Sequence, residues 1–356
     1  MEKKTVSKIK SVVSVLNSKD TLVINKNDTN YIIFTLDSKL SIEITDIYSS
    51  DSEDKNGFYT ITVKDFKKFI SHDFFCNLTA YAKFCEYSYG YENTLDAVYS
   101  NSLGYNERIL AVNYNDIHKC YVCFGDGNPI CNYMYFIDGT LYATNGHFIV
   151  KNKTDMDVDL TLYKDICTII EKLKENVLIQ FGKVIEDSSR SGGAKYNVVH
   201  MSVDVGEAVI RYTDASLTLD KETDYKNMLK NYKIEYKNGI KVNRKDLLTA
   251  VKNLKVVHPL GHAKLVVKDR VLSLFDLKVN HTLGGVITEL NEQKVTALNC
   301  CDSNFYGYFH IEYLEKLIKN IDNETLYINE KMLGDYALSY TIYDGNFTAY
   351  LMGVRI

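Results

Sequence analysis

The feature that most constrains this chain is a pattern that restarts along it, in which an amphipathic helix is followed by several strand-like runs. Apolar residues recur every three or four positions over Lys4–Leu16, and comparable helical faces surround Phe66, Ile169 and Leu247. The intervening runs are rich in β-branched and aromatic residues and are separated by Asn, Asp, Ser and Gly clusters. The order helix, strands, helix, strands occurs three times, at about 115 residues per repeat, and predicts an α+β protein.

The length and the restarts together suggest how the chain is divided. A chain of 356 residues exceeds one ordinary core and indicates two or three domains. We expect three, over residues 1–113, 114–232 and 233–356, with only strands between Ile70 and Arg108. No apolar run reaches the roughly 18 residues of a membrane span, and the first residues lack the apolar core of a signal peptide. A cytoplasmic protein is therefore expected.

The charged residues are unevenly placed. A formal net charge of −4 argues against a protein that coats DNA with its whole surface, although it leaves room for a local basic face. Basic residues gather on the outer faces of the expected helices: Lys4, Lys8, Lys64, Lys67, Lys68, Lys164, Lys172, Arg244, Lys245, Lys252, Lys316 and Lys319. From these residues alone, ordinary solvated helix faces are the simpler explanation.

The sequence carries little that indicates catalysis. Its eight cysteines, with no secretion signal, are expected to be reduced thiols. Cys120 and Cys123 have zinc-knuckle spacing, with His118 and Cys131 nearby, but the second ligand pair is missing. The sequence has no phosphate-binding loop, dinucleotide fingerprint or nucleophile elbow, and 258–262 is expected to be a loop. We expect no metal, no cofactor and no catalytic residue; a thiol or metal enzyme is the remote alternative.

Two distant segments suggest a family. Leu141–Val150 reads LYATNGHFIV, and the C-terminal part contains FHIEYLEKLI at Phe309–Ile318 and TAYLMGVRI at Thr348–Ile356. These segments resemble motifs of the bacterial sliding clamp, the beta subunit of the replicative DNA polymerase. That family carries L-x-A-T-D-G-H-R-L in its second domain and closes its third with Y-L…(M-P)-x-R-L. The resemblance is good from about Asp138 onward and rests on element order before that.

The resemblance implies a ring. In the family, each of three domains packs two helices on antiparallel sheets, the helices line a channel around duplex DNA, and two subunits join head to tail. The twelve basic residues would then face the phosphates without reading bases. The implied partners are double-stranded DNA, a DNA polymerase and a clamp loader, the last two bound through short peptide motifs.

The resemblance also implies a pocket for those peptides between the second and third domains. The family segment F-P-D-Y-R-R-V-L matches Glu222–Leu229 here, so that segment would contribute to the wall. The implied pocket residues are Thr144, Gly146, His147, Phe148, Ile149, Thr223, Asn227, Met228, His310, Tyr313, Tyr350, Met352, Gly353, Val354 and Arg355. The alternative is that these residues are core at a domain junction.

Four departures from the family pattern bear on that pocket: Asn145 for Asp, Phe148 for Arg, Thr223 for Pro and Gly353 for Pro. They keep the wall apolar and are expected to change its rim, and with it the peptide preference. Such divergence would suit a clamp encoded by a phage with its own polymerase, which would act in the host cytoplasm beside the nucleoid. The leading expectation is a non-enzymatic sliding clamp. The alternative in another class is a clamp-fold adaptor that recruits partners, for example in phage transcription, without encircling DNA.

Overall fold

The structure is a computed structural model of the whole chain. It describes residues 1–45, 54–71, 78–86, 89–103, 109–124, 129–187, 194–217, 240–257, 261–280, 286–298, 305–333 and 337–353. The chain divides into two compact units, the first made of residues 1–117 and 161–218 and the second of 118–160 and 219–356. The expected division into three domains stays a prediction.

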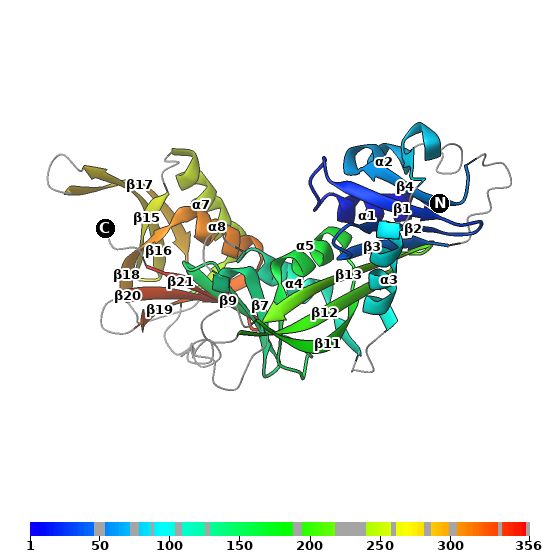
Figure 1. The fold of residues 1–356 in the computed structure, drawn as a ribbon. Helices are drawn as coiled ribbons and strands as arrows, with labels where there is room; N and C mark the ends of the chain where they lie inside the picture. Colours follow the sequence, from blue (N-terminus) through cyan, green and yellow to red (C-terminus); the bar gives the residue numbers. More distant parts are fainter. Residues whose placement is uncertain are drawn as a thin grey trace. The chain divides into compact units, whose positions relative to one another are not determined.

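The first unit is built on one large antiparallel sheet, drawn in Figure 1. Its strand order is β5-β4-β1-β2-β3-β13-β12-β11-β6. The N-terminal strands are β1 (Thr21–Lys26), β2 (Tyr31–Thr35), β3 (Leu40–Ile44), β4 (Gly57–Thr62), β5 (Lys83–Phe84) and β6 (Ile109–Val112). The others are β11 (Val177–Asp187), β12 (Ala194–Asp204) and β13 (Ala208–Leu217). The pairing of β3 with β13 makes one sheet from two distant chain segments.

Three amphipathic helices of this unit lie where the sequence predicts them: α1 (Lys3–Val13), α2 (Val63–Phe69) and α5 (Lys164–Leu173). In α5 the spacing of Ile166, Ile169 and Ile170 places all three in the core. The Thr62 hydroxyl caps α2 by accepting a hydrogen bond from the Asp65 N–H at 3.1 Å. Helix α1 contacts both α2 and α5. The lysines of α1, α2 and α5 therefore lie on helices that contact one another.

The expectation of only strands between Ile70 and Arg108 is wrong. Besides β5 and a short 3-10 turn (Leu78–Ala80), this stretch forms helix α3 (Tyr89–Leu103). Tyr91, Leu95 and Val98 recur at helical spacing, and the last two are buried against β-strand residues such as Phe34 and Phe58. The tyrosines and serines of the segment obscure this helical spacing in the sequence. The packing against the sheet decides the helix, since tertiary contacts contribute most of helical stability.

The second unit contains a sheet in the order β7-β8-β9-β21-β20-β19-β14. Along the chain, the boundary between the units falls within β10 (Leu160–Tyr163). The strands are β7 (Tyr133–Ile137), β8 (Thr140–Thr144), β9 (Phe148–Lys153), β14 (Ile240–Asn243), β19 (Thr325–Leu333), β20 (Ala337–Tyr343) and β21 (Phe347–Met352). Asp138 and Gly139 take left-handed conformations, with φ of 48° and 68°, and close the two-residue turn between β7 and β8. The central pairing, β9 with β21, joins segments about 200 residues apart.

A four-stranded antiparallel sheet completes the second unit, in the order β17-β16-β15-β18. Its strands are β15 (His262–Lys268), β16 (Val271–Asn280), β17 (Val286–Thr296) and β18 (Phe305–His310). Helices α7 (Arg244–Val257) and α8 (Ile311–Lys319) pack on each other, and α7 also contacts β16 and β17. A further helix, α4 (Tyr114–Tyr121), spans the unit boundary and precedes a short 3-10 helix (Pro129–Asn132).

The α+β class with antiparallel sheets is thus confirmed. His262 lies at the start of β15, so the expected loop over 258–262 is wrong at its last residue. Across the described ranges, no helix is both long enough and apolar enough to cross a membrane.

Candidate functional site

The turn between β8 and β9 is held by its own polar side chains. The Asn145 Oδ1 accepts hydrogen bonds from the N–H groups of His147, at 2.9 Å, and Phe148, at 3.0 Å. The buried Thr144 hydroxyl donates to the Phe148 carbonyl at 2.9 Å and accepts from the Gly146 N–H at 3.1 Å. Gly146 has φ of +84°, a conformation that favours glycine. An amide oxygen thus suffices at position 145, where the family has a carboxylate.

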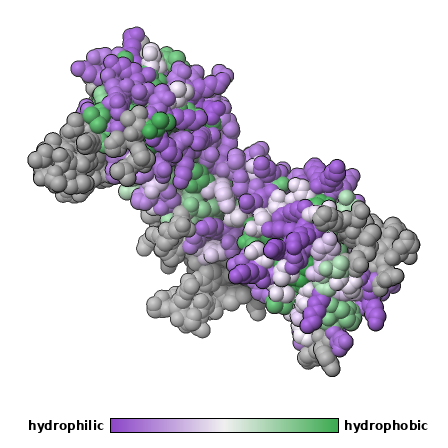
Figure 2. Space-filling model, turned by 90° about the horizontal axis from the view of Figure 1, so that it is seen from above, coloured by the Kyte–Doolittle hydropathy of each residue, from purple (hydrophilic) through white to green (hydrophobic). Residues whose placement is uncertain are grey.

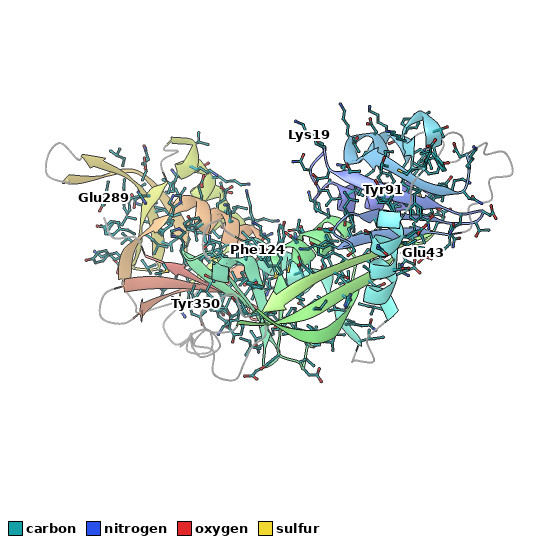
Figure 3. All side chains as sticks on the ribbon, in the orientation of Figure 1. Lys19, Glu43, Tyr91, Phe124, Glu289 and Tyr350 are labelled. Carbon is teal, nitrogen blue, oxygen red and sulfur yellow. The ribbon has the colours of Figure 1, made fainter. Side chains whose placement is uncertain are left out.

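Strand β21 fixes this turn to the C-terminal segment. Tyr350 lies opposite Ile149 and Leu351 opposite Phe148, and the Met352 N–H donates to the His147 carbonyl at 3.0 Å. Successive residues point to opposite faces of a strand. Ile149 and Tyr350 pack in one cluster (Tyr135, Ile137, Tyr142, Ile149 and Tyr350), and Tyr350, labelled in Figure 3, also lies under the Lys151 ammonium.

The other face of the turn meets an array of rings from α8 and β18. The Tyr313 ring stacks on His147, with centroids 5.0 Å apart, and lies 5.5 Å from the Phe148 ring. Tyr313 also contacts His310 at 4.6 Å, and His310 meets His262 edge-on at 5.5 Å. We call the Thr144–Ile149 turn, the Tyr350–Gly353 segment and these rings the peptide site. Gly146, His147 and Met352 are its exposed residues, and Met352 is 43% exposed.

His310 is the most constrained member of the array. Gly261 has φ of +90°, and a Cβ at that position would lie 2.7 Å from the His310 Cε1 and Nε2 atoms. Burial, and then the proximity of His262, lower the pKa of His310 below its ordinary value. The imidazole is therefore neutral near pH 7 and packs as an aromatic ring.

The structure brings together most of the residues implied for the peptide pocket. Those in the peptide site are Thr144, Gly146, His147, Phe148, Ile149, His310, Tyr313, Tyr350, Met352 and Gly353. Thr223, Asn227, Met228, Val354 and Arg355 lie outside the described residues. Sequence reasoning missed His262, Gly261 and Lys151, because only strand pairing brings them to the site and no local pattern marks them.

Two expected rim or wall positions need correction. Phe148 has no exposed surface, so it is not a rim residue, and an arginine there would bury a guanidinium at high cost. Ile149 is 8% exposed and packs among tyrosines, so most of its side chain belongs to the core and little of it can contact a peptide. Exposed Met352 remains the apolar residue with most surface to offer a partner.

Eight of the twelve basic residues on helices are exposed, and the other four, Lys8, Lys67, Lys164 and Arg244, are partly buried; the side chain of Lys8 is only 14% exposed. In the first unit, α1 carries four lysines and has no acidic residue in its first turn, so it is the most basic helix. Lys8 forms an ion pair with Glu175, and Lys68 forms one with Asp65 at 3.0 Å. Lys4 and Lys172 are exposed, while Lys164 is half-exposed.

In the second unit the lysines of α7 and α8 differ in their surroundings. The Glu315 carboxylate contacts the ammonium groups of Lys319, at 2.6 Å, and Lys255, at 2.9 Å, and Lys255 also approaches Glu312 at 3.7 Å. These pairs hold the pKa of Glu315 below its ordinary value. Lys245 and Lys252 on α7 are exposed. Figure 2, which looks down on the helices, shows hydrophilic colours over much of this unit.

Three cysteines of the second unit lie in its core. Cys120, Cys123 and Cys131 are buried and form no disulfide. Burial, with Cys120 and Cys131 nearby, raises the pKa of Cys123 well above its ordinary value, so the reactive thiolate is disfavoured. Within the described part of the chain, no group of three or more His, Cys, Asp or Glu residues is arranged to hold a metal ion.

The fold on which these sites lie is that of the bacterial DNA sliding clamps. The chain superposes on the DNA polymerase III beta subunit of Thermotoga maritima with a TM-score of 0.65 at 12% identity, covering 99% of this chain and 97% of that one. The corresponding subunit of Borrelia burgdorferi gives 0.64 at 16% identity, with 99% and 95% covered. The sliding clamp of Bacillus subtilis gives 0.62 at 12%, with 99% and 97% covered. Compared by sequence, the chain matches no family model and no curated protein. The resemblance drawn from two short motifs is confirmed at the level of the fold.

Proposed function

We propose that this protein is a DNA sliding clamp, which encircles duplex DNA and tethers a DNA polymerase through the peptide site. The observation that carries the proposal is the likeness to sliding clamps over 99% of the chain. The peptide site supports it, because its turn, its C-terminal strand and Tyr313 are those implied by the family motifs. The protein would act by binding and not by catalysis, in the cytoplasm where its DNA lies.

A clamp function requires a closed assembly. If each chain has the three domains expected from its sequence, two chains give a six-domain ring, so we propose a head-to-tail homodimer. Native mass measurement at micromolar concentration should give twice the mass of one chain, and low-resolution imaging should show a ring with a central hole. A strictly monomeric mass, or particles without a hole, would contradict this function.

Contact with DNA would come from the basic helices. Lys164, Lys172, Lys245 and Lys252 are each exposed or half-exposed, so their ammonium groups can approach phosphates from solvent. Because the net charge is −4, free linear duplex should bind weakly and with a steep salt dependence. Topological closure, not affinity, would hold the ring on DNA.

Charge reversal tests that contact. Replacing Lys164, Lys172, Lys245 and Lys252 with Glu should abolish stimulation of long-product synthesis by the cognate polymerase while the chain stays folded. The matched control reverses four exposed lysines outside these helices: Lys55, Lys83, Lys268 and Lys294. If the first variant still supports long products, or if both variants lose activity equally, the assignment of the DNA-facing helices is wrong.

The partner would bind as a short peptide over the exposed part of the peptide site. Met352 and the exposed His147, with its stacked Tyr313, offer an apolar and aromatic surface beside the β9–β21 pairing. Such a small contact surface favours exchangeable partners, including a polymerase and a clamp loader. A clamp-fold adaptor, for example in phage transcription, would bind peptide in the same way. The imaging experiment separates the two, because only the clamp has to form a ring.

A further inference from the structure

A cavity of about 210 Å³ lies in the first unit, and none of the residues that line it belongs to the peptide site. Its floor is the face of the large sheet formed by β3, β13, β12, β11 and β6, and Val98 of α3 contributes to its wall. For scale, an apolar cavity of about 150 Å³ can hold benzene. The volume therefore fits one ring or two small fused rings, and is too small for a drug-sized ligand.

The register of the strands orders the polar groups on this floor. Residues directly opposite each other on paired strands share a face, as do residues two apart on one strand. Two adjacent rows result, one running Ser41, Arg211, Ser202 and Leu178 and the next running Thr213, His200, Gln180 and Ile109. Each row begins with hydroxyl or cationic groups and ends with an aliphatic side chain.

The two cations at this floor already have carboxylate partners. The Arg211 guanidinium contacts Glu43, labelled in Figure 3, at 2.8 Å, and the Lys39 ammonium contacts Asp214 at 2.9 Å. Burial lowers the pKa of His200 to about 4, so that its imidazole is neutral near pH 7. An anionic ligand would have to compete with Glu43 or Asp214. The floor thus favours a ligand without net charge.

The apolar end of the cavity is open to solvent. Ile109 is 56% exposed and Leu178 is 50% exposed, and they are among the few large hydrophobic residues of the described chain that are so exposed. Both line the cavity. An exposed apolar rim around a polar floor is typical of a ligand site. The floor offers amide and hydroxyl groups to the edge of a ligand, and the aliphatic groups of Val98 and Leu178 suit its faces.

We propose that this cavity binds a neutral, flat heterocycle of one or two rings that carries hydrogen-bond donors and acceptors along its edge, the chemistry of a nucleobase. Gln180, Ser202 and Thr213 contact the ligand edge, and Leu178 and Val98 contact its faces. This binding activity is additional to the proposed clamp function and rests on residues of the first unit alone.

The experiment uses the full chain with its histidine rings labelled at Cε1. His200 lies on the floor of the cavity, and His200→Gln identifies its NMR signal among the eight histidines. Titration with adenine, hypoxanthine, cytosine and uracil should shift the His200 signal for at least one base, with a dissociation constant of about 0.1 to 1 mM. Uracil-6-carboxylate, which adds one negative charge to uracil, should bind at least about tenfold more weakly than uracil if uracil is among the binders.

Variants locate the binding. Gln180→Leu keeps the side-chain size but removes the amide, and should weaken binding at least about fivefold. Leu178→Ser removes the aliphatic contact at a half-exposed position and should also weaken binding. This variant tests the same site if Gln180→Leu does not fold. Leu36→Ser is the matched control, since Leu36 is 55% exposed in the same unit and does not line the cavity.

Several results would overturn the proposal. One is no shift of the His200 signal with any base at about 5 mM. Another is equal affinity in Leu178→Ser and Leu36→Ser, which would place the ligand elsewhere. Tighter binding of the carboxylate than of uracil would show that Arg211 and Lys39 form an anion site, and would refute the neutral class of ligand.

Discussion

Truncating Met352 is the cleanest test of the peptide site. Met352 is 43% exposed, so a bound peptide can cover at most that part of its surface. Complete burial of a methionine side chain contributes about 1.5 to 3 kcal/mol. Covering 43% of it therefore contributes about 0.6 to 1.3 kcal/mol, which corresponds to about three- to ninefold in affinity. Met352→Ala should weaken peptide binding by that factor.

The same substitution should leave the fold unchanged, because surface substitutions usually change the free energy of unfolding by less than about 0.5 kcal/mol. Ile149→Ala would be a poorer test. Ile149 is 8% exposed and packs against Tyr350 and Tyr142, so its truncation should cost about 2 to 5 kcal/mol of folding free energy. A loss of binding in that variant could not be separated from damage to the site.

The assay is a titration of a fluorescent peptide, taken from the C-terminus of the cognate polymerase, against wild type and variants, with unfolding followed in parallel. Val256→Ala is the control, because Val256 is 85% exposed in the same unit and lies outside the peptide site. Unchanged affinity in Met352→Ala would refute the assignment of the exposed thioether to the peptide surface. An equal loss in Val256→Ala would show that the effect is not local.

Three further predictions concern backbone strain, DNA contact and pH. Gly261→Ala should destabilise the chain by at least about 1 to 3 kcal/mol in urea unfolding, because it combines a φ of +90° with a Cβ 2.7 Å from His310; Gly345→Ala, at φ of +115° with open space around it, should cost only the backbone part. Lys245→Glu with Lys252→Glu should flatten the salt dependence of DNA binding, by about 0.9 in log–log slope for each phosphate that the protein no longer neutralises. Since the folded-state pKa of His200 is about 4, below its unfolded value, the unfolded chain binds more protons between about pH 6.5 and pH 4. Wild type should lose about 2 to 4 kcal/mol of stability over that window, and His200→Gln should lose correspondingly less in matched urea titrations.

The local patterns of the sequence predicted much of the secondary structure. Helices α1, α2, α5 and α7 form at the helical faces predicted over Lys4–Leu16 and around Phe66, Ile169 and Leu247, because each presents an apolar stripe at a period of 3.6 residues that is buried on folding. The turn at Asn145–Phe148 was likewise recognisable, since its amide and glycine satisfy requirements set within four residues.

The candidate site was predicted in composition and only partly in geometry. Motif resemblance assigned Thr144, Tyr313 and Tyr350 to one site. In the structure Thr144 and Tyr350 both lie opposite Ile149 on strands that flank β9, and Tyr313 stacks on His147. The resemblance predicted Phe148 at the rim of the pocket, whereas its side chain is buried. Successive residues of a strand face opposite sides, and the local sequence does not show which side is the core. The sequence-based prediction missed helix α3 for a related reason, since the sheet face that buries Leu95 and Val98 is made of residues far away in the chain.

By itself, then, the sequence determined the α+β class, the order of its main helices and the turn chemistry at Asn145, all of which depend on neighbours within a few residues. Tertiary structure alone decided that β3 pairs with β13 and β9 with β21, that Tyr313 lies between His147 and His310, and that hydroxyl, amide and aliphatic groups from five strands form one cavity. The physical reason is that strand pairing depends on backbone hydrogen bonds between segments of any separation, and a change of register by one residue would turn every side chain to the opposite face.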